Sequence, residues 1–319
     1  MPLPIPIPKE TAEFTLEVAG VLDVGRYEIQ SFHVERLINK IPVAMITILD
    51  GSVADQTYPA TDGPDFVPGM EVTLLAGTSE LKNEIFKGII TTQKISQDAR
   101  GTLLALTVKD VAVRMTVGRK NAYYEQTSDD SVLEAILAKY SGKGITGTVE
   151  AAKFPTENLD MVQFYSTDWD FMMSRVEASA RVAIVENGNI TIKTPTVADS
   201  DSNFCVAFGP TTFSFEAEMD ARNEYSDVMA KSWNGVKREL EQFEVTDVDD
   251  FKTEGNIEPD TLAEDVIGLE EYVLQHGGKL STKELEQWAY AKMLRSRLSK
   301  IRGRVKVDGT ALVKPGDNI

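Results

Sequence analysis

Cysteine and histidine are almost absent from this sequence, which has one cysteine and two histidines among its 319 residues. The single Cys205 cannot form an internal disulfide or a zinc site of several thiolates, and its apolar neighbours favour a small buried side chain. His33 falls in an alternating strand pattern and His276 precedes two glycines, and neither has the spacing of a metal ligand. We therefore expect no metal and no cofactor, and the composition argues against most classes of enzyme.

Positive charge is also scarce, because 33 Lys and Arg residues face 50 Asp and Glu residues and leave a formal net charge of −17. A chain this acidic repels phosphate backbones and anionic membranes, so we expect no nucleic-acid partner. No window approaches the ~18–20 apolar residues that a membrane helix needs, so we expect no membrane span.

The first residues carry proline at positions 2, 4, 6 and 8 and lack the basic region of a signal peptide. Alternating proline favours an extended backbone that cannot donate normal ladder hydrogen bonds. We expect residues 1–11 to form an extended arm, either a loose or surface-bound tail or a segment lying across a neighbouring subunit. The protein is expected to be cytoplasmic when it is synthesised and assembled.

Motifs for catalysis and phosphate binding are missing as well. The sequence has no glycine-rich phosphate loop and no Asp-x-Asp-x-Asp-Gly calcium loop. The pairs Asp129/Asp130 and Asp249/Asp250 are adjacent in sequence, whereas a glycosidase needs two carboxylates at a set separation across a sugar cleft. We assign these carboxylates to helix capping and surface solvation, and we predict no catalytic residue and no enzymatic activity.

The length suits two or three domains, and residues 12–122 have the pattern of a first β unit. Apolar and polar residues alternate over 27–36 and 43–49, before an Asp-Gly turn at 50–51. Further strand candidates cover 70–76, 85–95 and 102–110. About six antiparallel strands over this length predict a small barrel or a strongly bent sheet.

Helical periodicity begins at Thr127, and residues 123–198 are expected to form an inserted α/β module. Thr127 or Ser128 can cap a first helix, and a second helix begins near Thr167. The second helix places Trp169, Met173 and Val176 on one face, and we predict these residues in the core. The following Asn187-Gly188 is a strong signal for a two-residue hairpin turn.

Residues 199–319 are expected to form a second β unit that contains an acidic excursion and a helix. From position 239 to 271 the sequence has 13 acidic residues and one basic residue, and we read 239–275 as partly ordered at best. A helix is predicted over 281–301, opened by the capping-box pattern Ser-Thr-Lys-Glu, with Trp288, Leu294 and Leu298 in its core face. Its cations either neutralise the acidic excursion or a neighbouring chain, or form a docking patch.

A weak internal repeat links the two β units. Val67-Pro-Gly-Met opens a run of three strands in the first unit, and Lys314-Pro-Gly-Asp stands at the corresponding point of the second. If the two units are homologous, the second barrel lacks its last strands. We therefore predict that the natural protein continues into further β structure, because a half-closed sheet leaves unpaired edges.

Three stretches, in this order, carry a resemblance to a known family: Ser166–Ala178 with its hairpin, Leu269–Gln275 leading into Leu294–Gly303, and Gly309–Asp317. Together they resemble the VgrG family of spike and baseplate-hub proteins of type VI secretion systems and extracellular contractile injection systems. These proteins are similar to the central hub of contractile phage tails. The resemblance covers about residues 12–319 and supports an α+β, mostly β fold. We predict two tandem small β-barrels, the inserted α/β module, and a long helix in the second barrel.

The resemblance implies a structural hub. Family members are trimers, and two similar barrels per chain give six around the axis, which adapts a sixfold tail tube to a threefold spike. The implied partners are two further copies of the chain, a tail tube (Hcp-like) protein, baseplate proteins, and a spike tip or effector. In the family the Lys-Pro-Gly-Asp segment continues into the rest of the second barrel, an OB-fold and a β-helical spike. The protein would be delivered with, or released as part of, the injection particle.

Two other functions remain open from the sequence. One is a spike-associated cell-wall hydrolase, which peptidoglycan hydrolysis would reveal. The other is a carbohydrate- or receptor-binding β module, which glycan binding by the isolated protein would support.

Overall fold

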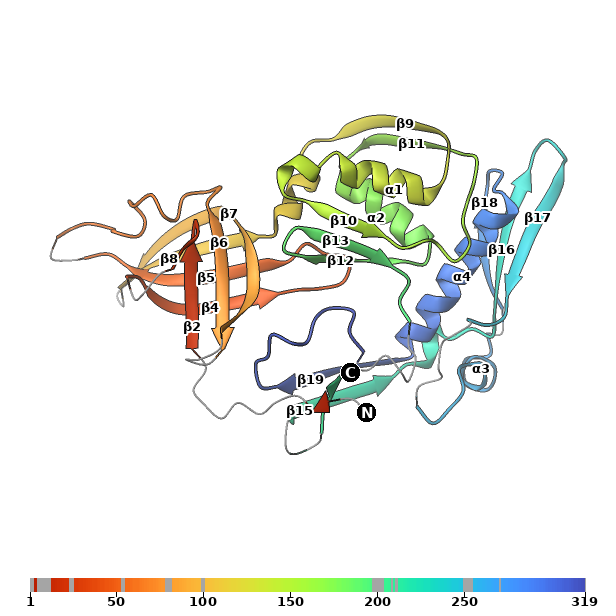
Figure 1. Ribbon diagram of the computed structural model, residues 1–319. Coiled ribbons are helices and arrows are strands. Elements are labelled where there is room, and N and C mark those ends of the chain that lie inside the picture. Colours follow the sequence, from red (N-terminus) through yellow and green to blue (C-terminus); the bar gives the residue numbers. More distant parts are fainter. Residues whose placement is uncertain are drawn as a thin grey trace.

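The computed structural model describes residues 3–4, 13–22, 26–52, 55–77, 82–98, 101–196, 204–207, 209, 212–248, 255–269 and 271–318. The described chain has three clusters of buried hydrophobic residues, each centred on its own group of strands and helices. Figure 1 shows these groups as a curled sheet, a module with two helices, and a sheet that carries a long helix. Strands predominate, which confirms the predicted α+β, mostly β class.

The first group is one antiparallel sheet of seven strands in the order β3-β2-β6-β7-β8-β5-β4. The strands are β2 (Glu13–Val18), β3 (Val21–Leu22), β4 (Glu28–Glu35), β5 (Val43–Asp50), β6 (Glu71–Gly77), β7 (Lys82–Asp98) and β8 (Gly101–Lys109). Every second side chain of β8 is buried, as expected for a strand with one face on a core. The sheet curls around a core that includes Leu16, Ile46 and Leu104. Among the described residues the end strands β3 and β4 do not pair with each other, so the sheet is a half-barrel with two open edges.

The inserted module places two helices between two sheets (Figure 1). Its elements are β9 (Lys120–Thr127), α1 (Asp129–Ala138), β10 (Thr146–Val149), β11 (Leu159–Ser166), α2 (Asp168–Ala178), β12 (Val182–Glu186) and β13 (Asn189–Lys193). Strands β9 and β11 pair as a ribbon, and β10-β13-β12 form a three-stranded sheet. The Ser128 side chain caps α1, and Asn187 and Gly188 take positive φ angles in the two-residue turn between β12 and β13, as the sequence predicted.

Two polar residues join this module to the half-barrel. The Asn39 amide N–H donates to the Ala183 carbonyl at 2.8 Å, and the Asn39 side-chain oxygen accepts from the Ala183 N–H at 2.8 Å. Asp110, which is 1% exposed, accepts from the N–H groups of Ala112 at 2.8 Å and Gly188 at 2.9 Å. It therefore caps a short 3₁₀ helix (Val111–Thr116) and holds the tip of the β12–β13 hairpin with one carboxylate.

The third group is a sheet in the order β17-β16-β18, packed against a long helix. Its main elements are β16 (Asp227–Asn234), β17 (Glu239–Val245), β18 (Glu271–His276) and α4 (Thr282–Ser299). Helix α4 begins with the predicted capping box, in which Ser281 and Glu284 each accept from the other's backbone N–H. A short helix α3 (Pro259–Thr261) continues into a wide turn of π-helix (Leu262–Ile267). A separate antiparallel ribbon, β15 (Thr212–Met219) and β19 (Ile301–Val307), stands apart from this sheet.

The described part of the acidic segment, residues 239–248, 255–269 and 271–275, contributes β17 and β18, which flank β16 on both sides. Val245 and Val248 are buried beside the half-buried Phe243, Tyr272 and Leu274, so a few apolar anchors at strand spacing hold these strands in place despite the acidic composition. The acidic residues of this segment lie mostly on exposed positions.

The Pro-rich arm is described only at β1 (Leu3–Pro4), whose backbone pairs in parallel with β14 (Phe204–Cys205) of the same chain. The remainder of residues 1–11, Asp249 and Asp250 lie outside the described residues. In the part of the chain that the structure describes, no helix is long and apolar enough to cross a membrane.

Leu298, predicted in the core face of the long helix, is instead 38% exposed. The last turn of α4 buries Ser296 and Arg297 against Glu224, so the buried face there is polar and turned away from Leu298. Leu294, one turn earlier, is 2% exposed, and the half-buried Trp288 packs against the same cluster.

These two leucines give a matched test of the packing. Leu294→Ala is expected to lower the free energy of unfolding by about 2–4 kcal/mol, since it leaves a cavity, whereas Leu298→Ala costs less than about 1 kcal/mol. Urea unfolding followed by circular dichroism measures both. Equal losses for the two variants would contradict the burial described here.

Candidate assembly surfaces

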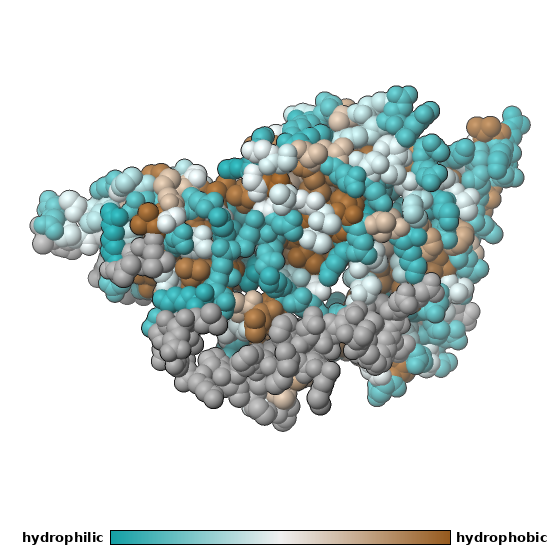
Figure 2. Space-filling model, viewed as in Figure 1, coloured by the Kyte–Doolittle hydropathy of each residue, from teal (hydrophilic) through white to brown (hydrophobic). Residues whose placement is uncertain are grey.

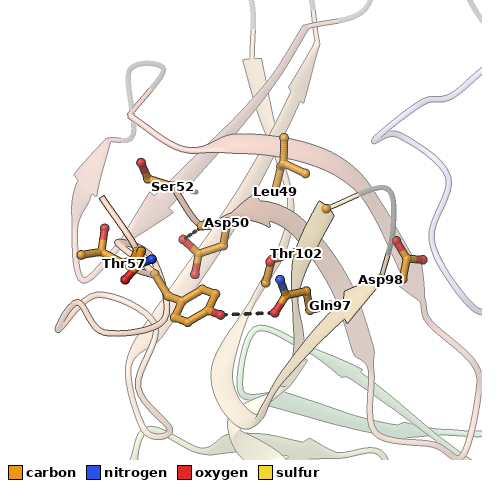
Figure 3. Close-up of a pocket in the computed structure, with 11 residues that line it drawn as sticks. Leu49, Asp50, Ser52, Thr57, Gln97, Asp98 and Thr102 are labelled. Atoms are coloured by element: carbon orange, nitrogen blue, oxygen red, sulfur yellow. Dashed lines mark hydrogen bonds between the residues drawn. The ribbon is translucent and has the colours of Figure 1, made fainter. Parts of the chain in front are cut away.

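A cavity of about 630 Å³ lies at one end of the half-barrel, between the ends of β5, β7 and β8 and the loop after β5 (Figure 3). The carboxylate of Asp50 forms part of its wall. One oxygen accepts from the N–H groups of Gly51 at 2.8 Å and Ala60 at 2.9 Å, and the other accepts from the N–H and hydroxyl of Thr61 at 2.9 and 2.6 Å. Burial raises the pKa of Asp50, but these hydrogen bonds outweigh it and leave the pKa below its ordinary value.

Asp50 therefore holds the loop in place and has little capacity left to bind a ligand. Across the cavity the Tyr58 hydroxyl donates to the side-chain oxygen of Gln97 at 3.3 Å, and Figure 3 shows Asp98 standing apart from Asp50. The remaining lining consists of Leu49 and of hydroxyl, amide and glycine residues. This arrangement shows neither a paired acid and base nor an activated nucleophile.

The residues that could have carried chemistry are dispersed. His33 is exposed on β4, and exposed His276 bonds through Nδ1 to the Gly278 backbone. Cys205 is half-buried rather than fully buried as expected, because β14 has only the short β1 as its partner in the described chain. Across the described ranges no three His, Cys, Asp or Glu side chains gather in a way that could hold a metal ion.

Asp129 differs from the assignment to capping and solvation, since it is 1% exposed. Its carboxylate accepts from Arg175 Nε at 2.6 Å and from the Thr156 hydroxyl at 2.9 Å, which ties α1 to α2 and to the loop before β11. Its neighbour Asp130 pairs with the buried Arg181 at 2.7 Å. Both carboxylates are structural.

Another buried carboxylate, Asp168, was not singled out by the sequence. Asp168 is fully buried and accepts from Lys120 Nζ, from the Tyr140 hydroxyl at 2.7 Å and from Gln163 Nε2 at 3.0 Å. The cluster joins α2, β9 and β11 with Tyr140, two residues after the end of α1. Burial raises the pKa of Asp168, but the hydrogen bonds from Lys120, Tyr140 and Gln163 outweigh it, so the pKa lies below its ordinary value. The core residues predicted beside it, Trp169, Met173 and Val176, are all buried in the module's core.

Exposed apolar side chains gather on two ribbons. On the outer face of β9–β11, Tyr123 and Val162 are paired across the strands and each 60% exposed, and Phe164 is 80% exposed. On β15–β19, Phe213 and Phe215 are 66% and 68% exposed. The face seen in Figure 2 is otherwise mostly hydrophilic, with hydrophobic residues in small groups. Exposed apolar strands of this kind are candidates for contact surfaces.

Comparisons with known proteins give a family match and a set of similar solved structures. The family described as Alg8 N-terminal domain matches residues 8–319. No curated protein matches the sequence. Among solved structures, the chain is similar to the 43 kDa tail protein of prophage MuSo2 from Shewanella oneidensis, with a TM-score of 0.65 and 12% identity over 94% of this chain and 83% of that one.

Two further structures are similar over most of their length. A tail protein from Neisseria meningitidis MC58 has a TM-score of 0.59 and 12% identity over 93% of this chain and 80% of that one. The prophage tail protein gp18 from Listeria monocytogenes has a TM-score of 0.54 and 7% identity over 86% and 76%. The chain therefore has the fold of these tail proteins.

The Asp168 cluster predicts a specific pH dependence of stability. Asp168→Ala leaves three donors without their acceptor and is expected to lower the free energy of unfolding by about 2–3 kcal/mol at pH 7. A carboxylate whose folded pKa is depressed stabilises the fold above its unfolded pKa of about 4, and this contribution is lost as the pH falls through the folded value. The difference in the free energy of unfolding between wild type and Asp168→Ala is thus expected to become smaller below about pH 4.

The control is Asp170→Ala, in the same first turn of α2 but exposed, with an expected cost of about 0.5 kcal/mol. Chemical unfolding at pH 7, 4 and 3 gives the free energy of unfolding of wild type and of both variants. A loss for Asp168→Ala that stays the same at all three pH values would contradict the lowered pKa of Asp168.

Proposed function

This chain belongs to the Alg8 N-terminal domain family, and from that premise and its tail-protein fold we propose that it is a structural component of a phage tail or tail-like baseplate. The single observation that carries the proposal is the fold match, which extends over 93–94% of the chain in two tail proteins. The family description names a domain and no activity, so the role is argued from fold and surface.

The surfaces favour a building block. The half-barrel leaves the outer edges of β3 and β4 unpaired within the described residues, and two ribbons carry exposed aromatic side chains. Monomeric proteins normally protect such edges, because unpaired N–H and C=O groups pair readily with another chain. An assembly component uses the same edges as interfaces.

We propose more specifically a VgrG-like hub of a contractile injection machine. Three copies around an axis, each with two β units, would match a sixfold tail tube to a threefold spike. The segments that resemble VgrG cover α2 with the β12–β13 hairpin, β18, the last turns of α4 with the start of β19, and residues 309–317 after β19. The proposed partners are the tail tube protein, baseplate proteins, and a spike tip or effector. Assembly in the cytoplasm and delivery with the particle belong to the same proposal.

We also propose that the protein acts without catalytic turnover. The carboxylates of Asp50, Asp129 and Asp168 are each occupied by several donors that hold the fold, and this supports a structural role for them. A cell-wall hydrolase would need a carboxylate or nucleophile free to meet substrate.

The mass of the protein in solution tests the hub proposal. Light scattering over a concentration series is expected to give a species of three times the chain's 35.2 kDa at high concentration. Hydrolysis of peptidoglycan or specific glycan binding by the same sample would favour the two alternatives. A monomer at every concentration would contradict the trimer.

A further inference from the structure

The ribbon β15–β19 is a sheet of only two strands in the described chain, and its side chains divide into two chemically distinct faces. The pairs Glu216↔Arg304 and Glu218↔Arg302 lie on one face, with Ser214↔Lys306. The pairs Phe215↔Val305, Ala217↔Gly303 and Met219↔Ile301 lie on the other. One face is therefore charged and the other apolar.

The apolar face is largely uncovered. Phe215 is 68% exposed and Val305 is 39% exposed. Phe213, at an irregular point of the register, is 66% exposed. The end near Met219 and Ile301 lies beside Gly255, where an added Cβ would lie 2.9 and 3.0 Å from these two side chains. A two-stranded ribbon is at best marginally stable in water, so this one requires a further strand or layer.

The two strands differ in charge. β15 carries Glu216 and Glu218, whereas β19 carries Arg302, Arg304 and Lys306. Arg302 is neutralised by Asp220 and lies 3.7 Å from Glu218. Within the described residues Glu216, Arg304 and Lys306 form no ion pair, although the chain as a whole is strongly acidic. The ribbon therefore has an acidic strand, β15, at one edge and a basic strand, β19, at the other.

We propose that the outer edge of β19 in one copy pairs with the outer edge of β15 in a second copy, in the antiparallel register that the two strands have within one chain. This pairing sets Arg304 of one copy opposite Glu216 of the next and continues the sheet. This pairing rests on the proposed function, in which copies of the chain assemble, and it names the surface through which they do so. Charge complementarity favours a second copy as the occupant, since one chain supplies both edges.

Rotational symmetry about an axis parallel to the ribbon is compatible with this pairing. All copies of β15 then run in one direction and all copies of β19 in the other, and every apolar face points to the same side of the sheet. In a trimer the three ribbons would close into six strands with the apolar faces inside, which leaves no open edge.

A charge-swap variant tests the pairing. Glu216→Arg combined with Arg304→Glu preserves the charge pair within each chain and also between copies of the variant. Between wild type and variant, however, it places like charges opposite one another at every shared edge. Wild type and variant, co-expressed with different tags, are expected to form their own assemblies, with mixed assemblies about tenfold below random mixing. Native mass spectrometry counts the species.

The matched control swaps the exposed ion pair of Glu71 and Lys87, which are 2.9 Å apart on β6 and β7 of the half-barrel. Glu71→Lys with Lys87→Glu is expected to mix randomly with wild type. If wild type assembles but mixes freely with the Glu216/Arg304 variant, the pairing of β15 with β19 is wrong and the proposed function stands. If wild type does not assemble at all, both fail.

Discussion

A β-strand presents backbone N–H and C=O groups along both edges, and the arrangement of this protein depends on where those groups find partners. Inside the half-barrel each strand from β2 to β5 in the sheet order has two neighbours, and the core lies on the concave side. At β3, β4 and the β15–β19 ribbon the pairing stops within the described chain. The same constraint that builds the sheets therefore leaves specific edges available for assembly.

Buried carboxylates connect elements both between the groups and within them. Asp110 fixes the half-barrel to the β12–β13 hairpin, Asp168 fixes α2 to the β9–β11 ribbon, and Glu224 meets Arg297 at the end of α4. Burial raises the pKa of Glu224 despite the opposing effect of Arg297, whereas hydrogen bonds keep that of Asp168 low. These residues are expensive to bury without partners, and their partners come from distant parts of the chain.

Local signals in the sequence predicted local structure well. The cap at Ser128, the turn at Asn187-Gly188 and the capping box at Ser281 each depend on residues within three or four positions, and all three are present. Pairings across long separations could not be read in the same way. β18 joins β16 in parallel from 44 positions away, and its neighbours in sequence are dominated by acidic residues that suggested disorder.

The contact surfaces were predictable only in part. The alternation of Phe213 and Phe215 with Ser214 and Glu216 is visible in the sequence, but the same pattern fits a strand buried on one side. Whether that side faces a core depends on what packs against it, and here almost nothing in the described chain does. Leu298 illustrates the same limit, because helical spacing alone does not tell which face the last turn of α4 buries.

The most direct test of the central claim is the position and copy number of this chain in a purified tail or tail-like particle, determined by cryo-electron microscopy. A structural hub is predicted to appear as three copies on the particle axis, where the tube meets the baseplate. A peripheral position, or absence from the assembled particle, would contradict that role.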